Sequence, residues 1–510
     1  MSGTQITMLI AMVLYLFGMM GIGIKLSERT SSVGDFYLAG RKLGPFVTAM
    51  SAEASDMSSW LLLGIPGLAY LAGIAEAGWT IIGLAVGTYL NWLFVAKKLR
   101  RYTEKSNSIT LPEFFSNRYG DKRYILTLIS AIWIVIFFIP YTASGFAACG
   151  KLFNSLFGVD YHAAMIISAI VIMFYTAMGG FLAASTTDFI QSIVMSFALV
   201  LILIFGTVKA GGMGAVMDNA KSLPGYLTLT ASHDAVSGGS TPYTLLTIFS
   251  TLAWGLGYFG MPHILLRFMA IEDDNKLKLS RRVASVWVVI SMCAALLIGM
   301  VGLQMSKVGA VATLEGSESE TIIVKIADLL ASNGILAAFF AGIVLSGILA
   351  ATMSTADSQL LAASSSVSND ILVKFFGIKL KEKRALLISR FSLLLIAVLA
   401  VFLAWNQDSS VFRIVSFAWG GFGGAFGPVV LLALFWRRSN RQGAIAGMLA
   451  GGIMIFIWKF GVRPMGGVLD IYELLPAFLV GLILNIIVSL ATSKPEKELT
   501  DLFDEVTAMK

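Results

Sequence analysis

Charge and thiols are scarce in this chain. Only 13% of its 510 residues are charged, whereas soluble domains carry about 25%. The two cysteines, Cys149 and Cys293, both lie in apolar stretches, so they suggest neither a disulfide framework nor a metal-ligand spacing. Histidine occurs three times, and the three residues form no triad or metal set with the acids. These shortages argue against a soluble protein and against an enzyme.

Apolar residues dominate instead. They make up 57% of the chain, and the mean hydropathy is +0.82. Runs of about 20 apolar residues, each long enough to cross a bilayer, recur from end to end. Because unpaired backbone groups cannot face lipid, each run is expected to be helical. We predict an all-α integral membrane protein with a single membrane domain over residues 1–510.

About thirteen transmembrane helices are predicted. Their approximate bounds are 6–25, 45–71, 75–97, 124–150, 160–179, 186–208, 242–266, 283–306, 334–368, 385–405, 413–436, 442–462 and 470–492. The first segment has no basic n-region and no A-x-A cleavage site, so we interpret it as a retained span rather than a signal peptide.

Basic residues favour alternate connections. With these boundaries, about 29 of the 37 Lys and Arg fall on one side of the membrane. They lie in the connections that contain Lys25 and Arg29, Lys97, Arg267, Lys374 and Arg437, and in the tail at about 493–510. The positive-inside rule then predicts an outer N-terminus and a cytoplasmic C-terminus in the inner (plasma) membrane. A basic cytoplasmic face also accounts for the net charge of +7 without a nucleic-acid partner.

Two spans carry unusual interruptions. Span two, 45–71, contains SAEASDMSS at residues 51–59, with four serines and two acids. Span seven, 242–266, contains WGLGYFGMPH, in which three glycines precede Pro262 and weaken the backbone ladder. Polar groups are costly in a bilayer and usually mark an ion or substrate pathway. For span seven, the alternative is a proline kink with glycines at a packing face.

The positions of the two breaks suggest an internal repeat. Transporters often bind substrate near the midplane, where discontinuous helices in corresponding halves line a cavity. Spans two and seven lie five spans apart, as expected for two inverted repeats at about 45–208 and 242–436. The residues themselves show no clear repeat, so this prediction rests on the breaks and on the topology.

A third polar site follows in span nine. The stretch LAATMSTADSQLLAASSSVSND, residues 349–370, is predicted to be interrupted at Ser354, Thr355, Asp357 and Ser358. Hydroxyl and carbonyl oxygens are ligands that hard cations prefer, and an unwound span two would supply the carbonyls. The alternative is that these Ser and Thr side chains bond back to carbonyls of their own helix.

Several long motifs occur in an order that identifies a family. They are YLAGRKLGPFVTAMSA, SDMSSWLLLGIPG, ITLPEFF, GGFLAASTTDFIQ, WGLGYFGMPHILLRFMA, LAATMSTADSQLL and AWGGFGGAFGPVVLLALFW. From about residue 6 to 490 the chain resembles the sodium/solute symporter family, and within it the bacterial sodium/proline symporters. The resemblance implies a LeuT-like fold of five plus five helices with flanking helices. It also implies alternating-access uptake of L-proline with Na+ as the coupling ion.

The resemblance also implies residue roles. One sodium would lie between spans two and nine, with five expected ligands: the carbonyls of Ala54, Met57 and Ala351 and the hydroxyls of Ser354 and Thr355. Asp56 matches a functionally sensitive acid beside that site. The positions that match the substrate site are Ser58, Ser59, Tyr141, Trp254, Tyr258 and Pro262, with Met261 beside them. Broken-helix N–H groups suit a carboxylate, and aromatic faces suit a pyrrolidinium ring. Taken alone, the aromatic residues would be ordinary packing residues.

A second cation site is a further expectation. Asp188, at the predicted start of span six, matches a family acid linked to cation coupling. With Asp357 and Ser358 it would build a second cation site, as in some family members. The alternative is that Asp188 caps the start of a helix near the cytoplasm.

Departures from the proline symporters gather at the inferred site. Those proteins usually have glycine at the positions of Glu53 and Ser59 and glutamine at that of Met261, and Pro140 is also unusual. We hypothesise that Glu53 carries a proton or pairs with a basic group. The alternative is an acid that faces a water-filled vestibule. Another small amino acid or organic solute, coupled to sodium or protons, therefore remains an alternative to proline.

Two other classes of protein fit the sequence less well. A channel would need a continuous polar pore, whereas the polar residues here gather at one depth on broken helices. A sensor would need a signalling module, for which the tail after the last span is too short. We interpret that tail as an amphipathic or frayed end. Oligomeric state, affinity and stoichiometry do not follow from the sequence.

Overall fold

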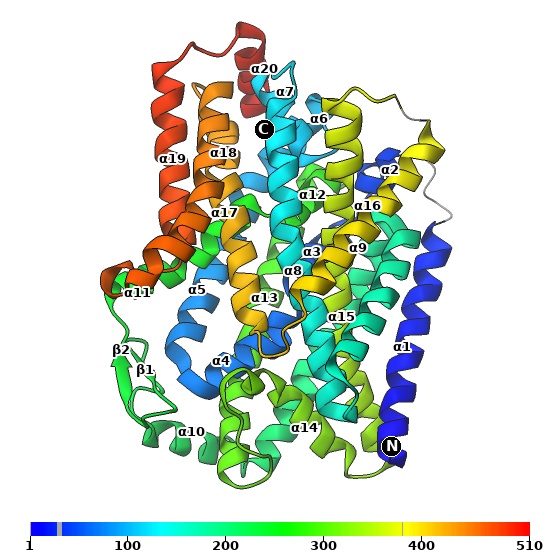
Figure 1. Cartoon of the computed structure of the whole chain (residues 1–510), viewed down its shortest axis with the longest axis vertical. Helices are drawn as coiled ribbons and strands as arrows, with labels where there is room; N and C mark the ends of the chain where they lie inside the picture. Colours follow the sequence, from blue (N-terminus) through cyan, green and yellow to red (C-terminus); the bar gives the residue numbers. More distant parts are fainter. Residues whose placement is uncertain (1, 28–32, 380, 510) are drawn as a thin grey trace.

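The computed structural model describes residues 2–27, 33–379 and 381–509, and most of them are helical (Figure 1). Two short strands, β1 (Ala231–His233) and β2 (Ser240–Pro242), pair antiparallel in the loop before span seven. The two ends of the chain lie near opposite ends of the long axis (Figure 1). Arg29, one of the residues counted above for the cytoplasmic side, lies outside the described residues.

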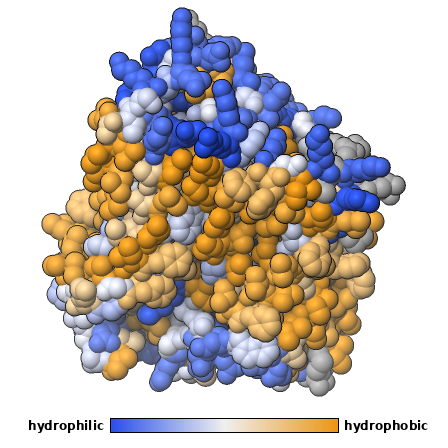
Figure 2. All heavy atoms as spheres, turned by 45° about the horizontal axis from the view of Figure 1, so that its top comes forward, coloured by the Kyte–Doolittle hydropathy of each residue, from blue (hydrophilic) through white to orange (hydrophobic). Residues whose placement is uncertain are grey.

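Ten helical segments of the described residues are long and apolar enough to cross a membrane. They are built from α1 (Gly3–Ser27), α5 (Ile74–Leu90) with η3 (Asn91–Val95) and α6 (Ala96–Lys105), α8 (Ile125–Phe157), the second part of α9 (Tyr161–Lys209), α13 (Leu277–Lys307), α15 (Ile335–Ser365) with η7 (Ser366–Phe375), α16 (Glu382–Leu403), α17 (Val411–Phe435), α18 (Arg441–Phe456) with η8 (Ile457–Val462), and α19 (Leu474–Ala491). Figure 2 shows their side chains as a hydrophobic band between two hydrophilic ends.

The other predicted spans match shorter or bent helices. One pair, Leu245–Gly260 and Pro262–Ala270, passes the same length and hydropathy test together and bends by 46°. Trp60–Ala72 and Tyr161–Ala177 are shorter apolar helices. Each predicted segment thus coincides with a helix, while thirteen crossings remain a prediction. The predicted connection between spans five and six is only a break within α9, where Gly180 has a φ of 68°.

The remaining elements connect these segments or complete the broken ones. They are α2 (Val33–Leu38), η1 (Ala39–Arg41), α3 (Pro45–Asp56), η2 (Trp60–Gly64), α4 (Ile65–Ala72), α7 (Leu111–Tyr119), α10 (Met213–Ser222), α11 (Leu245–Leu252), η4 (Ala253–Gly260), α12 (Pro262–Ala270), η5 (Asp274–Lys276), η6 (Gly316–Thr321), α14 (Ile322–Ala331), η9 (Arg463–Met465), η10 (Gly467–Leu469) and α20 (Lys497–Ala508).

Span two is broken inside its polar stretch. Helix α3 runs through Asp56, and Met57 then leaves the helical region with a φ of −73° and a ψ of 69°. After Ser58, the wide turn η2 begins at Trp60 and leads into α4. The predicted break is confirmed, and it is confined to the last third of SAEASDMSS.

Span seven is broken over a longer stretch. Helix α11 passes into the 3-10 segment η4, and Met261 is extended with a φ of −77° and a ψ of 107° before α12 starts at Pro262. The missing N–H of Pro262 costs nothing at the first helical position. Span seven is bent at this point, and its glycines also pack closely against another helix. The interpretation as a broken helix and the interpretation as a kink with packed glycines therefore both hold.

Glycines let the break of span seven touch α5 backbone to backbone. A Cβ on Gly87 would lie 2.3 Å from the carbonyl oxygen of Gly255, and one on Gly255 would lie 2.2 Å from that of Gly83. Any side chain at these three positions would separate the two segments. The spacing of Gly83 and Gly87 on α5 therefore fixes how closely η4 approaches the first half of the molecule.

The C-terminal tail is an ordered amphipathic helix. In α20, the apolar side chains of Phe503 and Val506 are buried, and Phe503 lies 4.9 Å from the guanidinium of Arg118 in α7. Ion pairs flank this contact at 2.6 Å between Lys105 and Glu505 and at 2.9 Å between Arg437 and Asp504. The helix thus joins α6, α7 and the end of α17, and the amphipathic interpretation of the tail is confirmed.

Candidate functional site

The break of span two presents its last carbonyl groups to other helices. The carbonyl oxygen of Asp56 accepts hydrogen bonds from the Trp60 indole at 2.9 Å and from the Tyr141 hydroxyl of α8 at 3.2 Å. A carbonyl at a helix end needs such a partner when no water reaches it. The end of α3 is therefore held in place by side chains on both sides.

The hydroxyls of span nine meet a carbonyl of span two. Ser354 donates to the carbonyl oxygen of Ala54 at 2.8 Å and Thr355 to the same atom at 3.5 Å, across 300 residues of sequence. Ser354 also lies 3.3 Å from the carbonyl oxygen of Ala351. Four of the five oxygens predicted to bind sodium thus converge between α3 and α15. The fifth belongs to Met57, the non-helical residue at the break.

The predicted interruption of span nine is wrong. Residues 354–358 lie within α15, which continues as an α-helix to Ser365. The backbone hydrogen-bond pattern changes only after that, in η7, which is a π-helix. Ser and Thr hydroxyls fit an intact helix when they bond to helix carbonyls, and here Ser354 contacts one carbonyl of its own helix and one of α3. The polar residues therefore form a face of an unbroken helix.

This oxygen set is suited to a hard monovalent cation. It consists of neutral hydroxyl and carbonyl oxygens, which are the ligands that such ions prefer. Ser354 and Ala54 are fully buried and Thr355 is 3% exposed, so the oxygens lie away from bulk water. No cluster of three or more His, Cys, Asp or Glu with metal-binding geometry occurs among the described residues.

Asp56 links the two broken spans. One carboxylate oxygen accepts a hydrogen bond of 2.5 Å from the Tyr258 hydroxyl of η4. Its other carboxylate oxygen has no hydrogen-bond partner among the described residues. The acid is fully buried, two residues from Ala54. Asp56 therefore lies close to the oxygen cluster and is hydrogen-bonded to the break of span seven.

Trp254 belongs to an aromatic cluster that the sequence did not predict. Its ring centroid lies 6.4 Å from Trp60 of span two and 5.2 Å from both Phe412 and Tyr472. Trp419 of α17 donates its indole N–H to the carbonyl oxygen of Trp254 at 2.8 Å. The aromatic wall therefore draws on α17 and the segment before α19 as well as on the broken spans.

The other predicted substrate residues are buried at the two breaks. Ser58, Met261 and Pro262 are all buried. The Ser59 hydroxyl is buried without a hydrogen-bond partner in the part of the chain that the structure describes. Tyr141 contacts the end of span two, as described above, and thus lies at the same place. The structure brings these residues together with Trp254 and Tyr258.

Glu53 lies one helical turn before Asp56 and faces α5. One of its carboxylate oxygens accepts hydrogen bonds from the Trp92 indole at 2.9 Å and from the Thr88 hydroxyl at 3.0 Å. Its other oxygen has no partner among the described residues, and the side chain is fully buried. The interpretation as an acid in a water-filled vestibule is therefore wrong. The described residues also provide no basic partner in hydrogen-bond contact with it.

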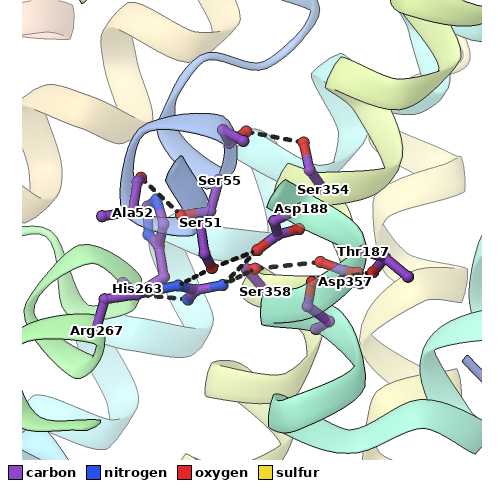
Figure 3. Close-up of polar contacts among 12 residues, drawn as sticks. Ser51, Ala52, Ser55, Thr187, Asp188, His263, Arg267, Ser354, Asp357 and Ser358 are labelled. Carbon is purple, nitrogen blue, oxygen red and sulfur yellow. Dashed lines mark hydrogen bonds and ion pairs between the residues drawn. The ribbon is translucent and has the colours of Figure 1, made fainter. Parts of the chain in front are cut away.

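Asp188 is not a helix cap. It lies within α9, fully buried, and its carboxylate pairs with Arg267 of α12 at 3.0 Å (Figure 3). Ser358 donates to Asp357 at 3.1 Å and lies 2.5 Å from the same guanidinium. The three residues of the predicted second cation site do come together. The partner that sequence reasoning missed is Arg267, whose only signal is a positive charge inside an apolar stretch, ILLRFMA.

Comparison with known proteins places this chain in a family. The model of the family described as "Sodium:solute symporter family" matches residues 36–451. A sodium/proline symporter of Haemophilus influenzae is 42% identical over 98% of this chain and 97% of its own. An osmoregulated proline transporter of Bacillus subtilis is 40% identical over 98% of each chain. A high-affinity proline transporter of the same organism is 41% identical over 96% of this chain and 98% of its own.

Solved structures show the same fold. A Na+-coupled sialic acid symporter in a substrate-bound, outward-open state superposes with a TM-score of 0.78, over 96% of this chain and 99% of its own, at 17% identity. A nucleobase-cation-symport-1 family transporter in a closed conformation superposes with a TM-score of 0.56, over 92% of this chain and 98% of its own, at 14% identity. The helical architecture is therefore that of LeuT-like sodium symporters. The family model and the proline transporters described above show that the protein is a membrane transporter rather than an enzyme. The chain belongs to the sodium:solute symporter family.

Proposed function

We propose that this protein carries L-proline into the cell together with Na+ by alternating access. The observation that carries the proposal is the meeting of the Ser354 and Thr355 hydroxyls with the Ala54 carbonyl, two residues from the Asp56–Tyr258 contact. An ion bound at the Ala54 carbonyl and a solute bound beside the Asp56–Tyr258 contact would then both touch the same short stretch of backbone. The proline transporters that are about 40% identical over nearly the whole length support this solute.

The sodium site of the proposal is the oxygen cluster between α3 and α15. Sodium is a co-transported substrate there, held by Ala54, Met57, Ala351, Ser354 and Thr355. An ion at that point would join α3 to α15 through contacts that neither helix makes alone. Ion binding would thereby favour one arrangement of the two helices, and this differential affinity is what couples an ion gradient to transport.

The substrate site of the proposal lies between the two breaks. Helix α12 starts at Pro262, and the backbone N–H groups of its first turn after that proline would attract a carboxylate. Trp254 and Tyr258 supply aromatic faces for the ring and its positive nitrogen. Ser58, Ser59, Tyr141 and Met261 complete the wall of the site.

Uptake by purified protein in proteoliposomes tests the proposal. Radiolabelled proline should accumulate when an inward sodium gradient is imposed and should not accumulate when potassium replaces sodium. Unlabelled proline should compete fully, and a panel of small amino acids and organic solutes should compete less. If another solute displaces the label better than proline, the alternative substrate is correct. A steady current without saturation by substrate would indicate a channel.

Glu53 gives the proposal its main alternative, coupling to protons. Among the described residues, the hydrogen-bond partners of the buried Glu53 carboxylate are the neutral donors Thr88 and Trp92. Such a group is costly as an anion, so we propose that Glu53 holds a proton. Glu53→Gln keeps the size and the hydrogen-bonding oxygen but cannot release a proton. If the proton moves during transport, wild type should respond to separately imposed sodium and pH gradients, and Glu53→Gln should respond to sodium alone. Pure sodium dependence in both proteins would contradict a coupling role for this proton.

The proposal also includes the topology. The two inverted repeats would span about 45–208 and 242–436, with one broken helix at the start of each. The N-terminus would lie outside the cell and the C-terminal helix α20 in the cytoplasm of a plasma-membrane protein. Figure 1 shows α6, α7 and α20 at the same end of the molecule. Lys105 and Arg437 form ion pairs with α20 there, and basic residues at this end support the orientation.

A further inference from the structure

A groove opens between α9 and α13 on the outer face of the helix bundle. Its volume is about 450 Å³, within the range of about 300–1,000 Å³ for pockets that hold small organic ligands. Val200 of α9 and Val286 and Ile290 of α13 line it, and they are 52%, 59% and 61% exposed. Both helices contain segments that are long and apolar enough to cross a membrane. This α9–α13 groove is therefore expected to face lipid rather than water.

The inner wall of the α9–α13 groove is held in place by a hydrogen bond between the two helices. Trp287 of α13 lines the groove and donates its indole N–H to the Ser196 hydroxyl of α9 at 2.8 Å. Ser196 in turn donates to the carbonyl oxygen of Ser192 at 2.7 Å. The buried side chain of Met50, from α3, also lines the groove. Because the indole and the Ser196 hydroxyl already have partners, the wall offers mainly apolar contacts to a ligand.

The length of the groove matches one leaflet of a bilayer. Its lining residues on α13 run from Arg282 to Ala294, which is about 18 Å along the helix at about 1.5 Å per residue. The hydrocarbon core of a bilayer is about 30 Å thick, so that each leaflet contributes about 15 Å. An acyl chain that lies along α13 would therefore fill the groove from end to end.

One end of the groove carries positive charge. Arg282 is exposed and lines the groove, and Lys278, also exposed, lies one helical turn earlier on the same face of α13. Neither side chain forms an ion pair with an acid among the described residues. This end of α13 lies near α20, because Arg101 contacts both Asp274, three residues before α13, and the carbonyl oxygen of Met509. The cations thus lie toward a polar end of the molecule, at the depth of lipid headgroups.

The neighbouring acids do not neutralise these two cations. Glu272 pairs with Lys276 at 2.6 Å. Asp274 pairs with Arg101, and Asp273 caps the short helix η5. The charge at this end of the groove is therefore available to an anion that approaches from the membrane surface.

We propose that the α9–α13 groove binds one anionic phospholipid. Its phosphate lies beside Arg282 and Lys278, and one acyl chain extends along Val286 and Ile290 toward the middle of the bilayer. A basic residue near the membrane surface favours an anionic lipid by about fivefold, and a zwitterionic lipid lacks this advantage. The inference goes beyond the proposed function, because it does not depend on the solute or the ion that the protein carries.

Trp287 provides the measurement, because bromine on an acyl chain quenches the fluorescence of a tryptophan that the chain touches. The protein has ten tryptophans, so the signal of Trp287 is the difference between wild type and Trp287→Phe. In phosphatidylcholine membranes with about one brominated phosphatidylglycerol in ten lipids, a fivefold preference should quench about a third of this signal, whereas brominated phosphatidylcholine at the same fraction should quench about a tenth.

Two arginine variants test the role of charge, each compared with its own Trp287→Phe double variant. Arg282→Gln should lower quenching by brominated phosphatidylglycerol toward the level of phosphatidylcholine. Arg281→Gln is the matched control, because the Arg281 guanidinium lies 5.3 Å from the Tyr89 ring of α5 and does not line the groove. It should keep the wild-type preference.

The possible results divide clearly. Equal quenching by the two lipids in wild type, or an unchanged preference in Arg282→Gln, overturns the inference. Absence of Trp287 quenching by either lipid also overturns it and indicates another occupant, such as a second copy of this chain. If Arg282→Gln does not purify, the wild-type comparison of the two lipids decides alone. Since no transport is measured, none of these results bears on the proposed function.

Discussion

Sodium-driven uptake is expected to collapse when Ser354 is replaced by alanine. The change deletes a hydroxyl that lies 2.8 Å from the Ala54 carbonyl and 3.3 Å from that of Ala351, at the centre of the proposed sodium ligands. Loss of a residue that only supports a metal ligand weakens binding about 10- to 100-fold, and a direct ligand should cost at least as much. The half-saturating sodium concentration for uptake should therefore rise by at least about tenfold.

A matched serine on the same helix provides the control. Ser346 is 1% exposed and donates to the carbonyl oxygen of Gly342 at 2.8 Å, within α15. Ser346→Ala loses a similar hydroxyl and a similar backbone contact but no proposed ligand. Its sodium dependence should match wild type. Equal sodium affinity in Ser354→Ala and Ser346→Ala would place the ion elsewhere.

The largest structural effect is expected from Gly87→Ala. The new methyl group would lie 2.3 Å from the carbonyl oxygen and 2.5 Å from the Cα of Gly255, so backbone, and not a flexible side chain, must move. Overpacking costs about 1–3 kcal/mol and occasionally more. Since η4 also holds Trp254 and Tyr258, displacement of this segment should abolish uptake as well as lower the thermal midpoint of the purified protein.

Gly78, on the same helix, offers the comparison. A Cβ there would meet only a side-chain atom of Leu229, at 3.2 Å. Gly78→Ala should therefore keep wild-type uptake and melting, and its better helix propensity offsets a small packing change. Unchanged melting and uptake in Gly87→Ala would show that α5 and η4 can separate without cost, contrary to the close contact described here.

The membrane architecture was predictable because its determinants are local. Apolar runs of span length, alternating basic connections and the breaks at SAEASDMSS and WGLGYFGMPH each follow from a short stretch of sequence. The same holds for the ordering of α20, whose apolar residues recur at helical spacing. These features need no knowledge of which helices lie side by side.

Interactions between distant residues were not predictable in this way. Arg267 and Asp188 are 79 positions apart in the sequence, and Glu53 and Trp92, which are hydrogen-bonded, are 39 positions apart. Whether a polar stretch breaks a helix is also decided by its neighbours. Residues 354–358 stay helical because their hydroxyls find carbonyls on α3 and on α15 itself. Composition alone made them resemble SAEASDMSS, which does break.

The docking of α20 has a practical consequence for experiments. Phe503 is buried beside Arg118, and Glu505 and Asp504 pair with Lys105 and Arg437. The last helix is therefore a fixed part of this end of the molecule. A fluorescent group attached to it would not hang on a free tether. Its distance to a second label elsewhere on the protein would report movements of the surface formed by α6, α7 and the end of α17, so an ordinary C-terminal label becomes a fixed reference point.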